Sequence, residues 1–157
     1  MSETIGVGSA LPDIAMTTPD GTVIKPSDFV GQKLVLFFYP KDDTPGCTTE
    51  NIDFSALAPQ FAAAGTTLLG VSKDPPKKHA KFIEKHALTA PLASDAEEGG
   101  LSDALGVWRE KSMYGRAYMG MERTTYLIGA DGKIARIWNK VKVKGHAAEV
   151  LAEASAI

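Results

Sequence analysis

Residues 33–72 read KLVLFFYPKDDTPGCTTENIDFSALAPQFAAAGTTLLGVS, and this stretch decides the fold class. It begins with a run from Lys33 to Tyr39 in which six consecutive residues are apolar or aromatic. A run without alternation is typical of a strand that is covered on both faces. Apolar side chains then recur at spacings of three and four over residues 45–64, which predicts an amphipathic helix. Thr66–Ser72 predicts a second apolar strand, so the stretch forms a β-α-β unit.

The flanking sequence predicts further elements on both sides of this unit. Upstream, the turn Pro19-Asp20-Gly21 separates two short strands at 14–17 and 22–24. Downstream, Asp131-Gly132 is a strong signal for a hairpin. The other expected elements are a helix over 75–86, a strand over 90–94, a short helix over 96–106, hairpin strands over 123–128 and 133–138, and a helix over 145–155. This order predicts an α/β fold, a thioredoxin-like sandwich with a central mixed β-sheet flanked by helices, in one domain over residues 1–157.

Composition and charge exclude several classes of function. The chain has 157 residues, 44% hydrophobic and 23% charged, which is ordinary for a globular domain. The net charge of -2 gives no electrostatic reason to expect nucleic acid or an anionic membrane as a partner. We interpret the one basic cluster, Lys140, Lys142 and Lys144, as a solvated edge, with a docking patch as the alternative. No apolar stretch approaches the ~20 residues that span a bilayer, and the first eight residues lack the pattern of a secretory signal, so we expect a cytoplasmic protein.

The chain contains a single cysteine, Cys47. An internal disulfide and a cysteine-rich metal site are therefore excluded by arithmetic. The sequence shows no clustered set of His, Asp and Glu and no glycine-rich phosphate loop, so we expect neither a metal nor a cofactor. A lone cysteine is often only a small buried hydrophobic residue. Its surroundings must decide between that interpretation and a reactive thiol.

The surroundings of Cys47 favour a reactive thiol. Thr44 is a good helix N-cap and Pro45 suits the first helical position, so Cys47 falls in the first turn. Unpaired N–H groups and the positive end of the helix dipole favour an anion there, and a thiol loses its proton more readily. The position also follows a central strand, where open α/β sheets build their sites. We therefore infer a nucleophilic thiolate.

The segment from Tyr39 to Glu50, YPKDDTPGCTTE, resembles the active-site segment of peroxiredoxins, in which Pro, Thr and Cys recur as P-x-x-x-T-x-x-C. In this chain these residues are Pro40, Thr44 and Cys47. The wider resemblance is to the bacterioferritin comigratory protein or PrxQ subfamily, and it covers nearly the whole chain. It rests also on residues 8–12, 70–72 and 123–128, the last reading RTTYLI.

This resemblance implies a thiol peroxidase that reduces hydrogen peroxide and organic hydroperoxides through a sulfenic acid at Cys47. By the family pattern, the Thr44 hydroxyl holds the peroxide, Pro40 shields the sulfur and Arg123 supplies a cation. The chemistry agrees with these roles. The thiolate attacks one peroxide oxygen while the other leaves with growing negative charge, and an arginine cannot deprotonate as it stabilises that charge. Glu50 either supports the helix start or hydrogen-bonds near the arginine.

The chain departs from many relatives because it lacks a second, resolving cysteine. Where relatives carry one, this chain has Ile52 or a residue near Ile83, and a further cysteine found in some relatives aligns near Ser102. An external thiol must therefore reduce the sulfenic acid, and glutathione, glutaredoxin, thioredoxin or a second copy of the chain are the candidates. Short termini and the subfamily resemblance lead us to expect a monomer.

Two other functions stay open. A redox sensor would form the same sulfenic acid but would not turn over. A Cys-dependent hydrolase would need a base near the thiol, whereas we expect His79, His86 and His146 at the surface and none of them in the active loop. Thiol–disulfide exchange would need a Cys-x-x-Cys pair, and Glu50 occupies the second position.

Trp108 and Trp138 are expected to pack in the core and not to contact a substrate.

Overall fold

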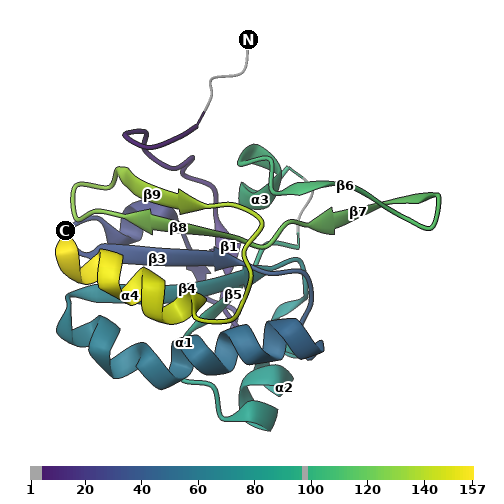
Figure 1. Cartoon of the computed structure of the whole chain (residues 1–157), viewed down its shortest axis with the longest axis horizontal. Coiled ribbons are helices and arrows are strands. Elements are labelled where there is room, and N and C mark those ends of the chain that lie inside the picture. The colour runs from purple at the N-terminus through teal and green to yellow at the C-terminus, as the bar shows by residue number, and fades with distance from the viewer. Residues whose placement is uncertain (1–4, 97–98) are drawn as a thin grey trace.

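A mixed sheet of seven strands forms the centre of the computed structural model, which describes residues 5–96 and 99–157 (Figure 1). The strand order is β2-β1-β5-β4-β3-β8-β9. Strand β4 pairs in parallel with β3 and β5, whereas β8 pairs antiparallel with β3 and β9. The strands are β1 (Met16–Thr17), β2 (Val23–Ile24), β3 (Lys33–Phe38), β4 (Thr66–Ser72), β5 (Leu92–Ser94), β8 (Thr124–Ile128) and β9 (Ile134–Trp138). The mixed central sheet expected from the sequence is confirmed.

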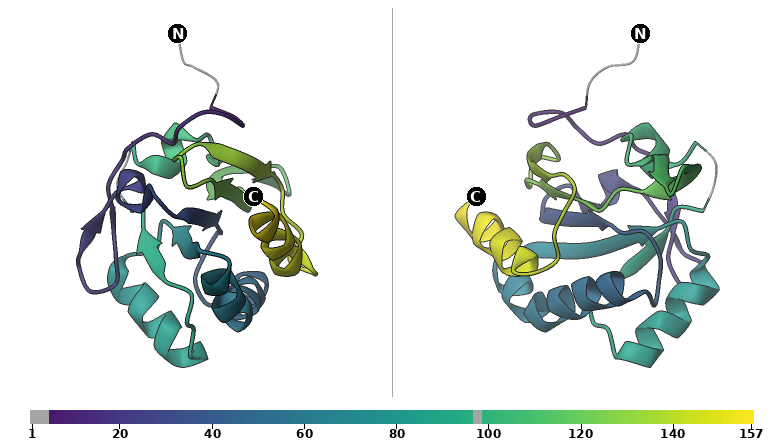
Figure 2. Two further views of the ribbon diagram at one scale, coloured as in Figure 1. Left: turned by 90° about the vertical axis from the view of Figure 1, so that its left-hand side faces the viewer. Right: turned by 45° about the vertical axis from the view of Figure 1, so that its right-hand side comes forward.

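Helices cover both faces of this sheet, as the sequence predicts. They are η1 (Pro26–Phe29, a 3-10 helix), α1 (Pro45–Ala63), α2 (Pro76–His86), α3 (Leu101–Ala104) and α4 (His146–Ala156). Val35 and Phe37 of β3 point to the face that α1, α2 and α4 cover. Leu34 and Leu36 point to the opposite face, where α3 and the N-terminal segment pack. Figure 2 shows α1 and α4 side by side along the sheet.

The middle of the sheet is tightly packed. Leu34 to Phe38 are at most 2% exposed, which explains the uninterrupted apolar run of β3. Gly70 of β4 lies opposite Phe37, and a Cβ atom there would stand 2.6 Å from the phenylalanine ring. Only glycine therefore lets β4 approach β3 at this point. The loops that follow β3 and β4 begin at the end of this tightly packed pair of strands.

One pair of strands was not predicted. β6 (Trp108–Met113) and β7 (Arg116–Met121) form an antiparallel hairpin that projects from the body of the molecule (Figure 1). Its turn consists of Tyr114 and Gly115, both with positive φ. The sequence lacks the Asn-Gly or Asp-Gly pair that usually marks such a turn. Most of β7 is exposed, so no apolar alternation reveals the strand either.

The helix predicted over 96–106 is shorter than expected. Residues 97 and 98 lie outside the described residues, and α3 begins only at Leu101. The Asp95 carboxylate accepts hydrogen bonds from the backbone N–H groups of Leu101 and Ser102, at 3.1 and 2.8 Å. The Asp95 side chain thus accepts from the first N–H groups of α3, and the helix begins after Asp95 and not at residue 96.

No helix among the described residues is both long and apolar enough to cross a membrane.

Candidate active site

The single cysteine lies in the first turn of α1, directly after the loop that leaves β3. Cys47 is 1% exposed. Thr44 occupies the N-cap position with extended backbone, and Pro45 is the first helical residue, as predicted. The Thr44 side chain, however, makes no capping hydrogen bond, so that part of the prediction is wrong. Its hydroxyl donates to the carbonyl oxygen of Lys41 at 2.8 Å, and the lone pairs of the hydroxyl oxygen can accept a hydrogen bond.

Strand pairing brings Arg123 to the sulfur. Phe38 at the end of β3 lies opposite Thr124, so the residue before Thr124 stands beside the loop that follows β3. Arg123 Nη2 donates to Cys47 Sγ at 3.4 Å. This contact places a permanent positive charge directly beside the sulfur. The sequence motif alone does not give this contact, because the two residues are 76 positions apart.

Glu50 holds the other side of the guanidinium group. Arg123 Nη1 donates to Glu50 Oε1 at 2.6 Å, so the second of the two roles expected for Glu50 is the observed one. Burial raises the pKa of Glu50 to about 7, although Arg123 acts in the opposite direction. Burial lowers the pKa of Arg123, but the charges of Glu50 and Cys47 outweigh it and the net shift is upward. Glu50 Oε2 is buried without a hydrogen-bond partner among the described residues.

Pro40 is half-buried and lies two residues after the end of β3. Its ring carries no N–H, so it belongs to the site by position and not by donating a hydrogen bond. The structure therefore joins Cys47, Arg123 and Glu50 by direct contacts. Thr44 and Pro40 lie in the loop between β3 and α1, which leads to Cys47.

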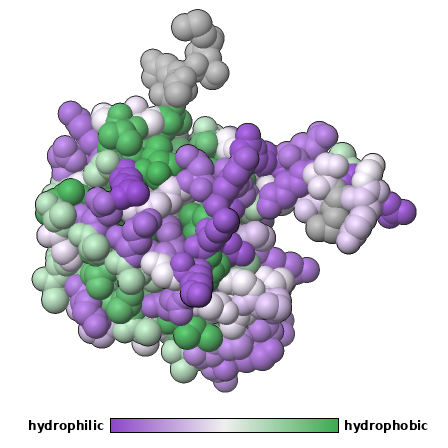
Figure 3. All heavy atoms as spheres, in the orientation of Figure 1, coloured by the Kyte–Doolittle hydropathy of each residue, from purple (hydrophilic) through white to green (hydrophobic). Residues whose placement is uncertain are grey.

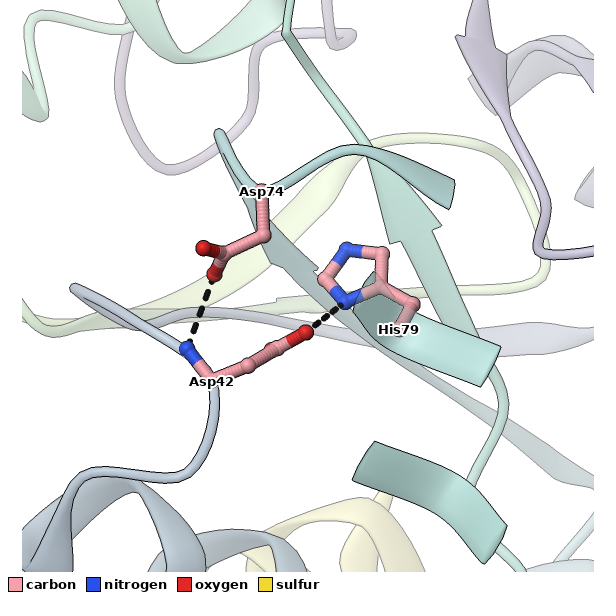
Figure 4. Close-up of side chains that lie close together, drawn as sticks. All are labelled: Asp42, Asp74 and His79. Carbon is pink, nitrogen blue, oxygen red and sulfur yellow. Dashed lines mark hydrogen bonds and ion pairs between the residues drawn. The ribbon is translucent and has the colours of Figure 1, made fainter. Parts of the chain in front are cut away.

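A buried hydrogen-bond network fixes this loop to the rest of the molecule (Figure 4). Asp42 Oδ2 lies 2.6 Å from His79 Nδ1 on α2, and the Tyr39 hydroxyl donates to Asp42 Oδ1 at 2.5 Å. The backbone N–H of Asp42 donates to Asp74 Oδ2 at 2.8 Å. His79 Nε2 lies 3.0 Å from the carbonyl oxygen of Ala93, which can only accept, so this ring nitrogen carries a proton. The loop that leads to the cysteine is thus held by α2 and by the ends of β4 and β5.

This network corrects the expectation that no His, Asp and Glu residues cluster. Ligand-type atoms of Asp42, Asp74 and His79 lie within 4.8 Å of one another. The sequence hides the group because its members are 32 and 37 positions apart. Asp42 and His79 bond to each other, and Asp74 accepts from Ser72, from the Asp42 backbone and from Lys78. The observed contacts therefore describe an anchor for the loop.

The expectation that the histidines lie at the surface is also wrong for two of the three. His79 is fully buried and His146 is 6% exposed, whereas His86 is half-buried. Lysines surround His79 in the sequence, but α2 turns it inward beside Phe82, three residues later. His146 Nε2 lies 2.8 Å from Thr125 Oγ1, and burial lowers the pKa of His146 to about 4. Among the described residues, no histidine hydrogen-bonds to the Cys47 sulfur, and the residue that donates to it is Arg123.

Both tryptophans pack in the core, as expected. Trp138 is 9% exposed and belongs to the cluster on the face of α1 and α4. Trp108 is partly buried against the cluster on the opposite face. Ile52, at one position expected for a resolving cysteine, is 43% exposed, and Ser102, near the position of a further cysteine in some relatives, is buried and bonded to Asp95. These positions show no sign of a second redox centre.

Comparisons with known proteins agree with this geometry. The family model described as AhpC/TSA family matches residues 7–137. Peroxiredoxin Bcp of Bacillus subtilis (strain 168) is 46% identical over 148 residues, which is 94% of each chain. The solved structure of Xanthomonas campestris peroxiredoxin Q has a TM-score of 0.88 at 43% identity, over 99% of this chain and 98% of that chain. BcpB from Mycobacterium tuberculosis has a TM-score of 0.84 at 34% identity, over 98% of both chains.

These matches extend over almost the whole chain and include the segment with the candidate site. The sequence and the fold of the chain are thus both similar to those of a known group of proteins. The chain is a member of the AhpC/TSA family, among the Bcp and PrxQ peroxiredoxins.

Proposed function

We propose that this protein is a thiol peroxidase that reduces hydrogen peroxide and organic hydroperoxides to water and alcohols. The contact of 3.4 Å between Arg123 and the Cys47 sulfur, at the start of α1, is the observation that carries the proposal. A peroxidase needs an ionised sulfur and a fixed positive charge beside the departing oxygen. Family membership supports the same reaction. For the Xanthomonas campestris bacterioferritin comigratory protein, alkyl peroxide reduction activity is on record, which favours organic hydroperoxides as substrates here as well.

In the first step, the Cys47 thiolate attacks one oxygen of the peroxide. The new sulfur–oxygen bond forms as the oxygen–oxygen bond breaks, and the other oxygen leaves as hydroxide or alkoxide and takes up a proton. The sulfur is oxidised to sulfenic acid and the peroxide is reduced. We assign Arg123 to stabilising the departing oxygen and Pro40 to limiting water at the sulfur. We assign Thr44 to accepting a hydrogen bond from the peroxide while its own proton is donated to the Lys41 carbonyl oxygen.

In the second step, a thiol from outside the chain must reduce the sulfenic acid, because the sequence holds no second cysteine. Glutathione, glutaredoxin and thioredoxin are the proposed reductants. We further propose that residues 1–157 form one domain that works as a monomer in the cytoplasm. One continuous sheet whose two faces both carry core residues supports the single domain. A reactive free thiol suits a reducing compartment.

The redox-sensor and hydrolase alternatives are less well supported. A hydrolase needs a base at the thiol, and the described residues place an arginine there. A sensor shares the sulfenic acid, so only turnover with a reductant separates the two. Relatives named peroxiredoxin favour turnover.

Intact-mass spectrometry after equimolar hydrogen peroxide tests the proposal. We expect one added oxygen on the wild-type chain and none on Cys47→Ser. Arg123→Ala should slow the addition by about 10²- to 10³-fold, because a donor to developing negative charge contributes that much. Arg116→Ala, an exposed arginine on the projecting hairpin, is the matched control and should react at the wild-type rate.

Two results would contradict the assignment. A wild-type chain that consumes no peroxide would exclude the peroxidase. An Arg123→Ala variant as fast as the wild type would remove the arginine from the mechanism. Repeated turnover after adding a thiol would separate the enzyme from the sensor.

A further inference from the structure

A lysine-rich loop lies beside the candidate active site. Lys140, Lys142 and Lys144 are in the loop between β9 and α4, and all three are exposed. Figure 3 shows hydrophilic side chains gathered over the loop that Figure 1 shows between β9 and α4. Over residues 5–96 and 99–157, none of the three has an ion-pair partner. Three uncompensated positive charges thus stand together on a chain whose net charge is -2.

These lysines surround a recess of about 340 Å³, named here the lysine recess. Its other lining residues include Trp138, Gly145, His146 and Glu149. The volume lies within the range of roughly 300–1,000 Å³ that is usual for small-molecule sites. The lysine recess therefore fits a small ligand better than a protein partner.

The charge of the lysine recess is positive. Because the pKa of His146 is about 4, its ring is neutral at pH 7. The Glu149 carboxylate is engaged by Trp138 Nε1 at 2.6 Å. Three ammonium groups and one carboxylate leave a charge of +2. The N-terminus of α4, where Gly145 offers no side-chain cap, adds a dipole of the same sign.

Direct contacts connect the lysine recess to the candidate active site. The backbone N–H of Val141, between two of the lysines, donates to the carbonyl oxygen of Arg123 at 2.9 Å. His146 contacts Thr125, two residues after Arg123, and its ring packs edge-on against Phe54 of α1. Arg123 therefore has the sulfur on its guanidinium side and the lysine loop on its backbone side.

We propose that the lysine recess binds a small thiol carrying carboxylate groups and thereby delivers the reductant to oxidised Cys47. The proposal rests on the proposed function, because it concerns the second step of that reaction. A cysteine that is 1% exposed is more accessible to a small thiol than to the thiol of a folded protein. Positive charge next to the site raises the local concentration of an anionic thiol and favours its reactive thiolate.

The redox step balances without any further reactant. The thiolate of the small thiol attacks the Cys47 sulfur, a sulfur–sulfur bond forms, and the sulfur–oxygen bond breaks. The oxygen leaves as hydroxide and takes up a proton as water. A second molecule of the thiol attacks the sulfur of the first, which releases their disulfide and the Cys47 thiolate.

Thiols of different charge test this proposal. The probes are glutathione and 3-mercaptopropionate as anions, 2-mercaptoethanol as the neutral thiol, and cysteamine as the cation. The oxidised chain is mixed with each at low ionic strength, loss of the sulfenic acid is followed by mass spectrometry, and rates are divided by thiolate concentration. We expect the anions to react roughly tenfold faster than the neutral thiol and cysteamine to react more slowly.

Two double variants test whether the lysine recess causes the preference for anionic thiols. Lys142→Gln with Lys144→Gln should reduce the preference for anions to near one, and 150 mM salt should weaken it in the wild type. Lys140 is left in place because its φ of 48° makes any substitution there harder to interpret. Lys25→Gln with Lys133→Gln removes two exposed lysines near β2 and β9 and should keep the full preference.

The possible failures are distinct. A wild-type chain that gains no oxygen from peroxide would contradict the proposed function itself. A chain that forms the sulfenic acid but reduces it equally fast with all four thiols would contradict only the lysine recess. Equal loss of preference in both double variants would assign it to overall charge and would also overturn the proposal. If all four thiols react slowly and thioredoxin, added as a fifth reductant, reacts rapidly, the reductant is a protein and the proposal for the lysine recess is overturned.

Discussion

At the scale of single residues, Glu50 and Cys47 compete for the positive charge of one guanidinium group. Arg123 reaches Glu50 Oε1 at 2.6 Å and the sulfur at 3.4 Å. With Glu50 neutral, more of that charge acts on the sulfur and on the departing oxygen. With Glu50 ionised, the pair is more nearly neutral. Because burial raises the Glu50 pKa to about 7, this balance changes close to physiological pH.

The raised pKa of Glu50 has a measurable effect on stability. Between its ordinary value of 4.5 and about 7, the unfolded chain gives up the proton first, so rising pH favours the unfolded state. The fold therefore loses stability across this window, by on the order of 3 kcal/mol in total. Glu50→Gln removes the titration. We expect the free energy of unfolding of the variant, relative to wild type, to rise by about 3 kcal/mol from pH 5 to pH 8.

Urea unfolding at the two pH values measures this difference. Loss of the partner of Arg123 lowers the stability of Glu50→Gln at both pH values, so the change between them isolates the titration. Glu153→Gln serves as the control because Glu153 pairs with Arg136 at the surface. Its relative stability should change by less than about 1 kcal/mol. A constant offset for Glu50→Gln at pH 5 and pH 8 would show that its carboxyl group titrates normally in the fold.

At the scale of elements, α2 holds the active loop through one buried pair. His79 and Asp42 have fully buried side chains, 2.6 Å apart. Removing one member leaves the other buried without its partner, which costs about 3–5 kcal/mol. We therefore expect His79→Ala to lower the free energy of unfolding by that amount. Hydrogen exchange of the loop between β3 and α1 should also become faster, because α2 no longer fixes it.

His86→Ala provides a matched control on the same helix. His86 also bonds an aspartate of the loop, Asp43, at 2.8 Å, but the side chains are 21% and 41% exposed. Exposed pairs contribute only about 0–1 kcal/mol. If His79→Ala and His86→Ala lost the same free energy of unfolding in urea, burial of the Asp42–His79 pair would not explain the loss in His79→Ala.

The two histidines also show where prediction from the sequence succeeded and where it stopped. Strands β3 and β4 were predicted almost to the residue because their uninterrupted apolar runs are buried on both faces. Helix α1 was predicted from the helical spacing of apolar residues such as Phe54 and Phe61, although its buried face also carries Glu50 and Asn51. The burial of His79 was missed because a polar residue on a buried helix face gives no hydrophobic signal. Its partner Asp42 is 37 positions away, and only the fold brings the two together.

The projecting hairpin of β6 and β7 was not predicted from the sequence, because its described residues form no buried face. Strands β6 and β7 pair with each other and not with the main sheet, so they need no continuous apolar face. The Tyr114-Gly115 turn was the one local signal, since Gly115 adopts a φ of 77° without strain. Pro40, Thr44, Cys47 and Arg123 came from a sequence motif. The charge state of Glu50 depends on burial, which no motif records.

At the scale of the whole molecule, a single cysteine in a closed fold determines how the catalytic cycle can end. Cys47 is 1% exposed and faces the interior of the sandwich. In this family a second cysteine can lie five positions later, where this chain has Ile52. Five residues of α-helix rise about 7.5 Å, which exceeds the roughly 7 Å between Cα atoms that a disulfide tolerates. An internal disulfide at that position would therefore require the start of α1 to unwind.

Ile52→Cys tests whether α1 can do so. Ile52 is 43% exposed, so the substitution disturbs little packing. If the first turns of α1 open, peroxide should leave the variant two hydrogens lighter than its reduced form, with less helix by circular dichroism. Ile52→Ser should instead keep the added oxygen, as the wild type does. An Ile52→Cys chain that keeps its sulfenic acid until an external thiol is added would show that α1 stays closed. The reductant must then reach the sulfur in the folded protein, and the surface around Arg123 decides which thiol succeeds.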